Sequence, residues 1–370
     1  MESLVMQKLF GGIYKDKTVL VTGHTGFKGS WLTYWLSQMG ANVIGYSLEA
    51  PTQPNHISLL NLNITSIIGD IRDLNKLNET FQTYKPDIVF HLAAQPLVRL
   101  SYENPIETYE TNVMGTLKVF EACRINGVKA IVNITSDKAY ENKEWIWGYR
   151  ENDPMGGYDP YSSSKGCADL LANSYRSSYF NPSEYKKSHN TLLASCRAGN
   201  VIGGGDWAKD RLMTDIMLSV SQGKKVSIRN PNATRPWQHV LEPLSGYLAI
   251  GQKLLEENVA FGEAWNFGPS DEGSITVEEV VNHVKKHWDK IDYDITRDPN
   301  QPHEANLLKL DCSKAHIRLK WKDVWDSETT FEKTVLWYKK FYENNSVLTE
   351  KDLKDYITDA KHKKVIWAEL

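Results

Sequence analysis

The chain has 370 residues, enough for about two domain-sized units with a sizeable core. The net charge of −3 and the sequence pI near 6.4 argue against a nucleic-acid partner. The N-terminus lacks the pattern of a secretion signal and no window approaches about 18 apolar residues, so we expect no membrane partner. The four cysteines are widely spaced without a C-x-x-C pair. This spacing predicts reduced thiols in a cytoplasmic protein, with neither a disulfide framework nor a metal site.

The first half of the chain alternates apolar strand-like runs with longer helical patterns, which is typical of a doubly wound parallel sheet. We expect strands at 18–22, 42–46, 65–69, 87–91, 129–135 and 191–197, and helices at 27–39, 73–83, 105–126 and 161–180. Such sheets bind ligands at the carboxyl ends of their strands. The predicted fold class is therefore α/β of the Rossmann type, with residues 1–198 as the dinucleotide-binding domain.

The alternation loosens in the second half, which predicts a smaller and discontinuous C-terminal lobe for the substrate, mainly at 199–370. Residues near 238–268 return to the first domain, with a helix at 241–257 and a strand at 264–267. In the lobe we expect helices at 210–222, 276–288, 328–343 and 349–359, a strand at 225–229, and loops at 203–207 and 230–236. The mixed charge of the last two helices predicts a solvated outer face.

A glycine-rich turn follows the first predicted strand. Val19-Leu20-Val21 leads into Gly23, Gly26 and Gly29, and a helical segment and a second strand follow within about 30 residues. In that context the glycines allow a tight turn, close approach to a pyrophosphate and close helix packing. The alternative is an ordinary turn between a strand and a helix. The turn residues expected to contact a dinucleotide are Gly23, Thr25, Gly26, Phe27, Lys28 and Gly29.

The G-x-x-G-x-x-G spacing resembles that of the short-chain dehydrogenase/reductase superfamily in its extended form. In that superfamily an Asp followed by an apolar residue after the third strand cups the adenine, and the resemblance implies this role for Asp70 and Ile71. Asp73 is the better candidate for capping the following helix. Ala93 and Ala94 follow the fourth strand, and their small side chains leave room for the cofactor ribose.

The second predicted strand ends in a departure from the usual pattern. An NAD-binding unit normally carries Asp or Glu there, which binds both ribose hydroxyls. Ser47 takes that place in this chain, with Glu49 two residues further on. Glu49 would repel a 2′-phosphate, and no arginine lies nearby in the sequence, although Lys28 offers an alternative phosphate contact. NAD is therefore the predicted cofactor.

A hydroxyl, a phenol and a lysine form the predicted catalytic set. Ser136 closes the fifth strand, and Tyr161 and Lys165 share one face of the following helix at i and i+4. The lysine cation, with a positive nicotinamide nearby, is expected to lower the pKa of the phenol toward neutrality. An incidental Y-x-x-x-K on a helix is the alternative. We expect Ser136 to hold the substrate hydroxyl that Tyr161 deprotonates.

Asp137 and Lys138 go beyond what a plain dehydrogenase requires. They resemble the Thr-Asp-Glu segment of the sugar-nucleotide 4,6-dehydratases, with Lys in place of Glu. The resemblance implies that Asp137 is the acid for the C6 hydroxyl and that Lys138 stands where the base for C5–H would be. Two other roles remain open for Lys138: a protonated lysine that stabilises the enolate, and a structural ion pair with Asp137.

Further motifs resemble the branch of these dehydratases that acts on CDP-glucose, from about residue 10 to about residue 345. They are Thr-Gly-His-Thr-Gly-Phe-Lys-Gly29, His-Leu-Ala-Ala-Gln-Pro96, Gly-Asn-Val-Ile-Gly-Gly-Gly-Asp-Trp207 and Arg-Pro-Trp-Gln-His-Val240. The resemblance implies that the sugar or its diphosphate is bound by Asn200, Arg211, Arg235 and His239. A surface salt bridge is the alternative for the arginines, and His303-Glu304 matches a family segment without an assigned role.

The resemblance implies an NAD-dependent lyase that dehydrates CDP-glucose and so supplies deoxysugars for surface polysaccharide such as the O-antigen. It also implies a homodimer or a dimer of dimers, formed through the helices at 105–126 and 161–180. The alternatives are a sugar-nucleotide 4-epimerase, a dehydratase for another nucleotide sugar, and a non-catalytic protein that senses NAD.

Overall fold

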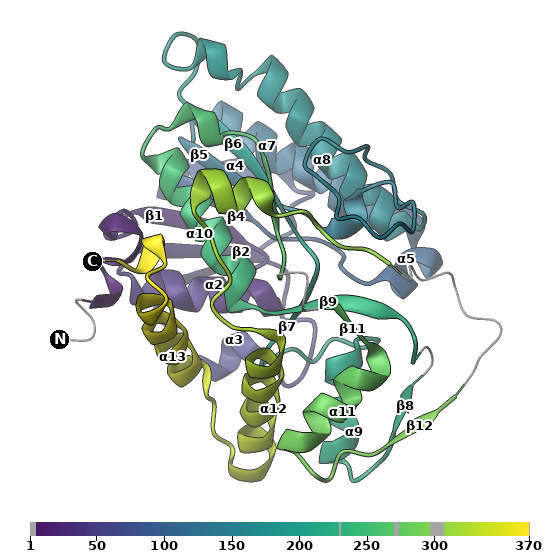
Figure 1. Cartoon of the computed structure of the whole chain (residues 1–370). Helices are drawn as coiled ribbons and strands as arrows, with labels where there is room; N and C mark the ends of the chain where they lie inside the picture. Colours follow the sequence, from purple (N-terminus) through teal and green to yellow (C-terminus); the bar gives the residue numbers. More distant parts are fainter. Residues whose placement is uncertain (1–4, 229–230, 270–273, 297–306, 370) are drawn as a thin grey trace.

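The computed structural model describes residues 5–228, 231–269, 274–296 and 307–369, and its core is one parallel sheet (Figure 1). The strand order is β10-β6-β5-β4-β1-β2-β3, and each neighbouring pair is parallel. This confirms the predicted Rossmann-type α/β fold and the return of the chain as a seventh strand. The strands are β1 (Thr18–Thr22), β2 (Asn42–Ser47), β3 (Thr65–Ile68), β4 (Ile88–His91), β5 (Ala130–Ile134), β6 (Leu192–Ala198) and β10 (Ala264–Phe267).

Helices cover both faces of this sheet, because the central strands are apolar on both sides. One face packs against α2 (Phe27–Gln38) and α10 (Leu241–Leu255), and the other against α4 (Leu74–Tyr84), α7 (Thr116–Ile125) and α8 (Pro160–Ser178). Alternate residues of β1 divide between the two cores, with Val19 and Val21 in the first and Leu20 in the second. This alternation fixes the register of the strand that leads into the glycine turn.

The second half of the chain adds a lobe with a core of its own (lower part of Figure 1). A three-stranded sheet has the order β11-β9-β7, and β12 pairs with β8. The elements of the lobe are β7 (Asn200–Ile202), α9 (Leu212–Ser221), β8 (Val226–Ile228), β9 (Thr234–His239), β11 (Ser274–Thr276), α11 (Val277–His287), β12 (Tyr293–Ile295) and α12 (Ser327–Asn344). Because β7 follows β6 directly, the lobe begins at the carboxyl edge of the main sheet.

One expectation about the lobe is wrong. The loop expected at 230–236 is in part β9, which pairs with β7 and β11. The last two helices expose charged residues such as Glu332 and Lys351, and each also buries an apolar face. α12 buries Phe331 and Trp337 in the core of the lobe, and α13 (Thr349–His362) buries Tyr356 in the core of the main sheet.

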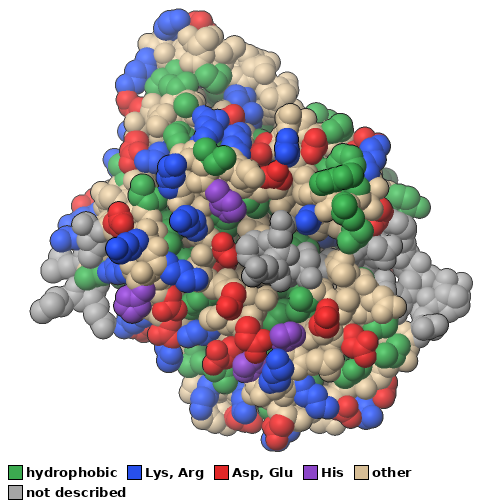
Figure 2. All heavy atoms as spheres, viewed as in Figure 1, with side chains coloured by type: hydrophobic (Ala, Val, Ile, Leu, Met, Phe, Trp, Pro, Cys, Tyr) green, Lys and Arg blue, Asp and Glu red, His purple; other side chains and the backbone are tan. Residues whose placement is uncertain are grey.

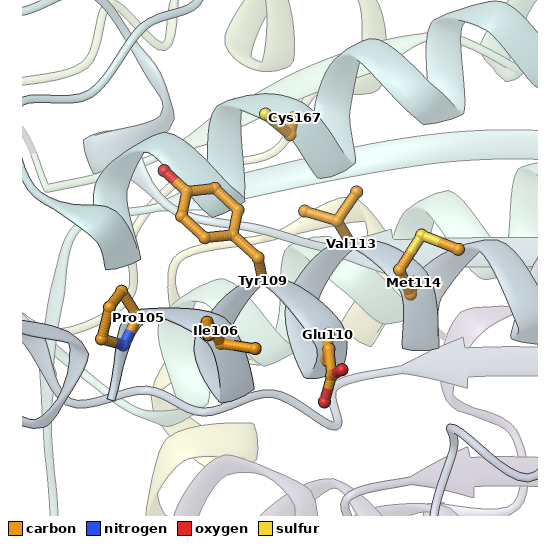
Figure 3. A pocket seen from close by; sticks show the side chains of 7 residues that line it. All are labelled: Pro105, Ile106, Tyr109, Glu110, Val113, Met114 and Cys167. Carbon is orange, nitrogen blue, oxygen red and sulfur yellow. The ribbon is translucent and has the colours of Figure 1, made fainter. Parts of the chain in front are cut away.

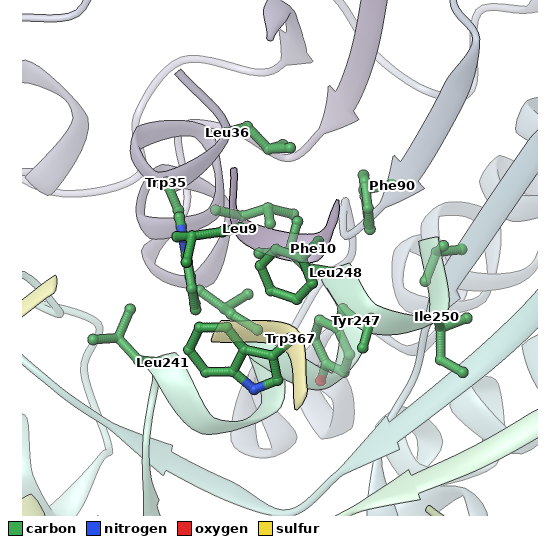
Figure 4. Packing of buried hydrophobic residues seen from close by; sticks show 14 of the residues in the cluster. Leu9, Phe10, Trp35, Leu36, Phe90, Leu241, Tyr247, Leu248, Ile250 and Trp367 are labelled. Atoms are coloured by element: carbon green, nitrogen blue, oxygen red, sulfur yellow. The ribbon is translucent and has the colours of Figure 1, made fainter. Parts of the chain in front are cut away.

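The two ends of the chain meet on that first core. Phe10, from the N-terminal turn, stacks on Trp367 with ring centroids 5.1 Å apart, and Trp35 of α2 packs edge-on against the same indole (Figure 4). Burial of such aromatic side chains contributes a large share of core stability. The C-terminal segment is therefore part of the first domain's core rather than of the lobe.

The helix expected at 105–126 is interrupted. It consists of α6 (Pro105–Tyr109), a π-helical turn at Glu110–Gly115, and α7. The turn ends at Gly115, where a Cβ atom would lie 2.6 Å from Cδ1 of Ile71. A short helix, α5 (Val98–Glu103), precedes α6 and was not predicted.

Basic and acidic side chains are interspersed over the face shown in Figure 2, in keeping with the small net charge. Among the described residues, none of the helices combines the length and the apolar character that a membrane crossing requires.

Candidate active site

The glycine turn between β1 and α2 leaves space that side chains would fill. Gly23 has a φ of +76°, and a Cβ atom there would lie 2.8 Å from the backbone nitrogen of Ala93. A Cβ atom on Gly29 would lie 2.0 Å from the carbonyl oxygen of Gly23. Gly26 is the N-cap of α2 and provides no capping side chain, so the first N–H groups of the helix can receive an anion. This cradle fits the pyrophosphate of a dinucleotide.

Ser47 is the last residue of β2, as predicted, and it contacts the glycine turn. Its hydroxyl oxygen lies 2.7 Å from Oγ1 of Thr25, and Thr25 donates its own proton to the carbonyl oxygen of Leu48 at 3.0 Å. Ser47 therefore donates to Thr25, and its lone pairs stay available as acceptors for a ribose hydroxyl.

Asp70 follows β3 and is engaged by Arg72, a residue that the sequence reasoning missed. The backbone N–H of Arg72 donates to Oδ1 of Asp70 at 2.8 Å, and its Nη2 donates to Oδ2 at 2.7 Å. These bonds hold the pKa of Asp70 below its usual value. Asp73 caps α4 by accepting from the N–H of Lys76, which leaves Asp70 free of that task, as predicted.

Ser136, Asp137 and Lys138 form one compact turn after β5. The hydroxyl of Ser136 donates to Oδ1 of Asp137 at 2.9 Å, and the N–H of Lys138 donates to the Ser136 hydroxyl at 3.2 Å. Nζ of Lys138 lies 3.8 Å from the same Oδ1 atom. Asp137 is almost completely buried, whereas Lys138 keeps 27% of its side chain exposed. The ion pair between the two is thus present in the structure.

Tyr161 and Lys165 face this turn from α8, which begins after Asp159. Nζ of Lys165 donates to the carbonyl oxygen of Ile134 at 3.5 Å. Burial raises the pKa of Tyr161 to about 12, although the neighbouring Ser136 side chain acts to lower it. With the protein groups alone, the pKa of Tyr161 is therefore raised. The predicted lowering of this pKa also counted the positive charge of a nicotinamide. Burial also lowers the pKa of Lys165 to about 8.

Two further cations lie near Tyr161 and Asp137. Burial and the nearby charge of Arg211 lower the pKa of Lys28 to about 8, while Asp137 acts in the opposite direction. Arg211 precedes α9 and is ion-paired with Asp206 at 2.6 Å, and its charge acts on Tyr161. Arg211 therefore forms the salt bridge considered as the alternative and also lies near the predicted catalytic residues. Such a cluster of cations suits the phosphate groups of a cofactor and a sugar nucleotide.

The other substrate candidates lie at different depths. Asn200 opens β7 and is partly exposed. Arg235 lies in β9 opposite Ile275, and its side chain is outside what the structure describes, as are His303 and Glu304. The structure leaves the predicted substrate residue His239 without exposed surface. Its ring is fully buried against Trp325, with centroids 4.8 Å apart, and burial lowers its pKa to about 3.

Asn112, in the π-helical turn, connects two parts of the site and was missed in the sequence. Its Oδ1 accepts from the N–H of Gln95 at 2.8 Å, and its Nδ2 donates to Oγ of Ser164 at 2.9 Å. It thereby joins the loop after β4, which carries Ala93 and Ala94, to the helix of Tyr161. A polar residue in an otherwise helical segment is the sequence pattern that could have indicated Asn112. The sequence alone does not show the π-helical turn that directs it toward α8.

Comparison with known proteins finds a family model and a relative that match most of the chain. The model of the family described as GDP-mannose 4,6 dehydratase matches residues 20–335. The chain is 54% identical over 350 residues to a CDP-glucose 4,6-dehydratase of Salmonella typhimurium, which covers 93% of this chain and 97% of the relative.

Solved structures share the fold at lower identity. UDP-glucose 4-epimerase from Thermotoga maritima, solved with UDP-glucose, has a TM-score of 0.76 and 23% identity, covering 88% of this chain and 100% of that chain. UDP-glucose 4-epimerase from Thermus thermophilus, solved with NAD, has a TM-score of 0.74 and 22% identity, covering 87% of this chain and 99% of that chain. Since the family model spans most of the sequence and the Salmonella relative matches it over nearly its full length, the chain belongs to the GDP-mannose 4,6-dehydratase family.

Proposed function

We propose that this protein is an NAD-dependent CDP-glucose 4,6-dehydratase that converts CDP-D-glucose to CDP-4-keto-6-deoxy-D-glucose and water. The observation that carries the proposal is the Asp137–Lys138 ion pair, in which Asp137 also accepts from Ser136, close to the Tyr161 phenol. A 4-epimerase needs only the hydroxyl residue, the tyrosine and the lysine of its helix. A dehydratase also needs an acid and a base for the loss of water, and Asp137 and Lys138 can supply them. The identity to the Salmonella enzyme favours the CDP-linked substrate.

NAD bound in the glycine cradle would accept a hydride from C4 of the sugar and return it to C6. Tyr161 takes the proton of the C4 hydroxyl. Because burial raises the pKa of this phenol, its basic form depends on the cations of the pocket, and Lys165 supplies one from the same helix face. Ser136 orients the substrate hydroxyl toward the phenol.

Asp137 and Lys138 carry out the loss of water across C5 and C6. A proton first passes from Lys138 to Asp137 within the ion pair, which leaves a neutral amine and a neutral acid. Lys138 then takes the proton of C5, which the neighbouring ketone has made acidic, and Asp137 protonates the departing C6 oxygen. When the hydride returns to C6, Lys138 gives its proton back to C5. Asp137 has given one proton to the water and Tyr161 has gained one from the C4 hydroxyl. Ser136 donates to Asp137 and its side chain acts on the Tyr161 phenol, so its hydroxyl is the proposed route for that proton back to Asp137.

The test is incubation with CDP-glucose and NAD, followed by the absorbance of a 4-keto sugar in alkali. We expect this absorbance with CDP-glucose and little with dTDP-glucose or UDP-glucose. A C4 epimer without a keto sugar would replace the proposal with an epimerase. Absence of turnover with all three sugar nucleotides, despite NAD binding, would favour a sensing role.

For substrate binding, we propose contacts to the diphosphate of the sugar nucleotide. The charge of Arg211 acts on Tyr161, and a guanidinium suits bidentate contact with a diphosphate. Asn200 and the backbone position of Arg235 lie on neighbouring strands of the small sheet, so both can approach the same ligand. The product would enter the synthesis of surface-polysaccharide deoxysugars.

We further propose a homodimer, or a dimer of dimers, in the cytoplasm. A shallow apolar pocket lies on α6, the π-helical turn and α8 (Figure 3), and it is lined by Pro105, Ile106, Tyr109, Glu110, Val113, Met114 and Cys167. Ile106 is 75% exposed at its edge. Apolar surface of this kind marks interaction sites. The four unpaired cysteines suit a reducing compartment.

A further inference from the structure

A buried ion pair behind the active site takes no part in the proposed chemistry. Asp169 lies on α8, one helical turn after Lys165, and Arg197 lies on β6. Nε of Arg197 donates to Oδ2 of Asp169 at 3.1 Å and its Nη2 donates to Oδ1 at 3.2 Å, a bidentate arrangement. The two side chains are only 5% and 1% exposed. A buried pair gives little net stability compared with apolar residues, so stability alone does not account for this one.

Each partner of the pair also holds one end of the catalytic turn. The hydroxyl of Thr135, the residue before Ser136, donates to Oδ2 of Asp169 at 2.7 Å. At the other end, Nη1 of Arg197 donates to the phenol oxygen of Tyr140 at 2.6 Å. Tyr140 is itself fixed, because its hydroxyl donates to Oδ1 of Asn266 on β10 at 2.8 Å. The segment 136–138 therefore lies between two residues, Thr135 and Tyr140, that both hydrogen-bond the same ion pair.

We infer that Asp169 and Arg197 are positioning residues that set the distance between the catalytic turn at 136–138 and the face of α8 that carries Tyr161 and Lys165. The inference rests on the catalytic roles proposed above. Proton transfers need reacting atoms at hydrogen-bond distance, and a displacement of about 1 Å can lower a rate by about 100-fold. A link that joins α8 to both ends of the turn restrains that displacement.

The same pair acts on the charge of Lys165. Asp169 is the charged group that raises the pKa of Lys165 against the lowering by burial. Lys28 on α2 and His91 on β4 also lie close to Lys165, since its charge lowers the pKa of both, and Tyr161 shares its face of α8. Loss of the Asp169 charge would thus make Lys165 lose its proton at lower pH.

The test removes the two links and keeps the ion pair. Thr135→Val combined with Tyr140→Phe deletes both hydroxyls with little change in volume. We expect kcat for CDP-glucose dehydration to fall about 10- to 100-fold, with KM for CDP-glucose changed less than about twofold.

The matched control is Tyr149→Phe combined with Thr334→Val. The ring of Tyr149 stacks on that of Tyr140 at 5.2 Å, and its hydroxyl donates to Asn142 instead of contacting Arg197. Thr334 is a buried threonine whose hydroxyl bonds within α12. Both double variants lose one phenol and one threonine hydroxyl, so the control should keep kcat near the wild-type value.

A second arm uses the pH profile. Asp169→Asn should move the alkaline limb of kcat/KM to lower pH, and Asp169→Glu should return it toward the wild-type position.

Unchanged kcat in the Thr135→Val/Tyr140→Phe variant, or an equal loss in its control, would overturn the inference. Tyr161→Phe separates this failure from failure of the proposed function. If that variant loses turnover by about 10²–10⁴ while the link variant stays active, only the positioning role is wrong.

Discussion

Asp137 contacts two of the side chains to which the proposed reaction assigns a role. It accepts a hydrogen bond from Ser136 and lies 3.8 Å from Nζ of Lys138. Asp137→Asn keeps the size of the side chain but removes the acidic proton needed at C6. We expect the C4 oxidation to proceed and the overall turnover to fall by about 10²–10⁴. Rapid mixing with CDP-glucose should then show NADH absorbance that accumulates and decays slowly. If neither NADH nor product forms, Asp137 acts before the hydride leaves C4.

Lys138 poses a sharper question, because its ion pair with Asp137 is compatible with each of its three possible roles. A base must take the C5 proton, so solvent deuterium should enter C5 at a rate that depends on the group at position 138. We expect Lys138→Met to abolish exchange at C5 and Lys138→Glu to restore part of it, since Glu stands here in related dehydratases. Mass spectrometry of the product in deuterated water measures this. Exchange at the normal rate in Lys138→Met would leave Lys138 with an electrostatic or structural role.

At the scale of elements, local sequence patterns predicted the long helices and the buried strands of the main sheet. The lobe was harder. β9 contains Pro236, which pairs opposite Ser274 in a small sheet, and proline normally argues against a strand. β7 has only three residues, too few to show an alternating pattern. The apolar face of α12 was hidden by its mixed charges, because Phe331 and Trp337 stand among Lys and Glu.

The same limit applies to the site. Sequence order placed Ser47, Asp70 and Ser136 correctly at strand ends, because the topology of a parallel sheet brings those ends to one edge. The partners that hold them come from distant segments. Arg197 lies on β6 and contacts Tyr140, 57 positions away, and no local pattern signals such a contact.

A buried carboxyl of α10 joins three parts of the chain. Glu242 accepts hydrogen bonds from the N–H groups of Val324 at 3.0 Å and Trp325 at 2.7 Å, and from the hydroxyl of Tyr356 at 2.8 Å. Burial raises its pKa from 4.5 to about 8. The folded state therefore binds more protons at Glu242 than the unfolded state between these values, so the contribution of Glu242 to stability is full below pH 4.5 and declines as the pH rises toward 8.

We expect Glu242→Gln to flatten that decline, because glutamine keeps an acceptor oxygen for the N–H groups but does not titrate. Thermal melts between pH 5.5 and 8.5 measure the effect. Asp352, whose pKa burial raises to about 7, contributes a decline of the same sign that should remain in the variant. Glu256→Gln, at the exposed end of the same helix, is the control and should melt like the wild type. An unchanged slope in Glu242→Gln would show that this carboxyl is ionised throughout the range.

At the scale of the whole molecule, α6, the π-helical turn and α8 carry exposed apolar side chains. Ile106 is 75% exposed, Met114 is 46% exposed and Leu170 is 57% exposed. These exposed apolar side chains lie on elements that also support the site, since Asn112 bonds Ser164 between them. Pairing of two such faces would bury these side chains and hold Tyr161 and Lys165 on a more rigid helix.

The proposed dimer therefore predicts that a charge on this face separates the subunits and lowers activity. We expect the wild type to sediment as a dimer or a multiple of it, and Ile106→Asp to sediment as a monomer with reduced kcat, because burying a carboxylate in an apolar interface is costly. Ile317→Asp is the matched control, since Ile317 is 67% exposed on a different surface. It should keep both the mass and the activity of the wild type. A monomeric wild type with full turnover would show that this face has another partner or none.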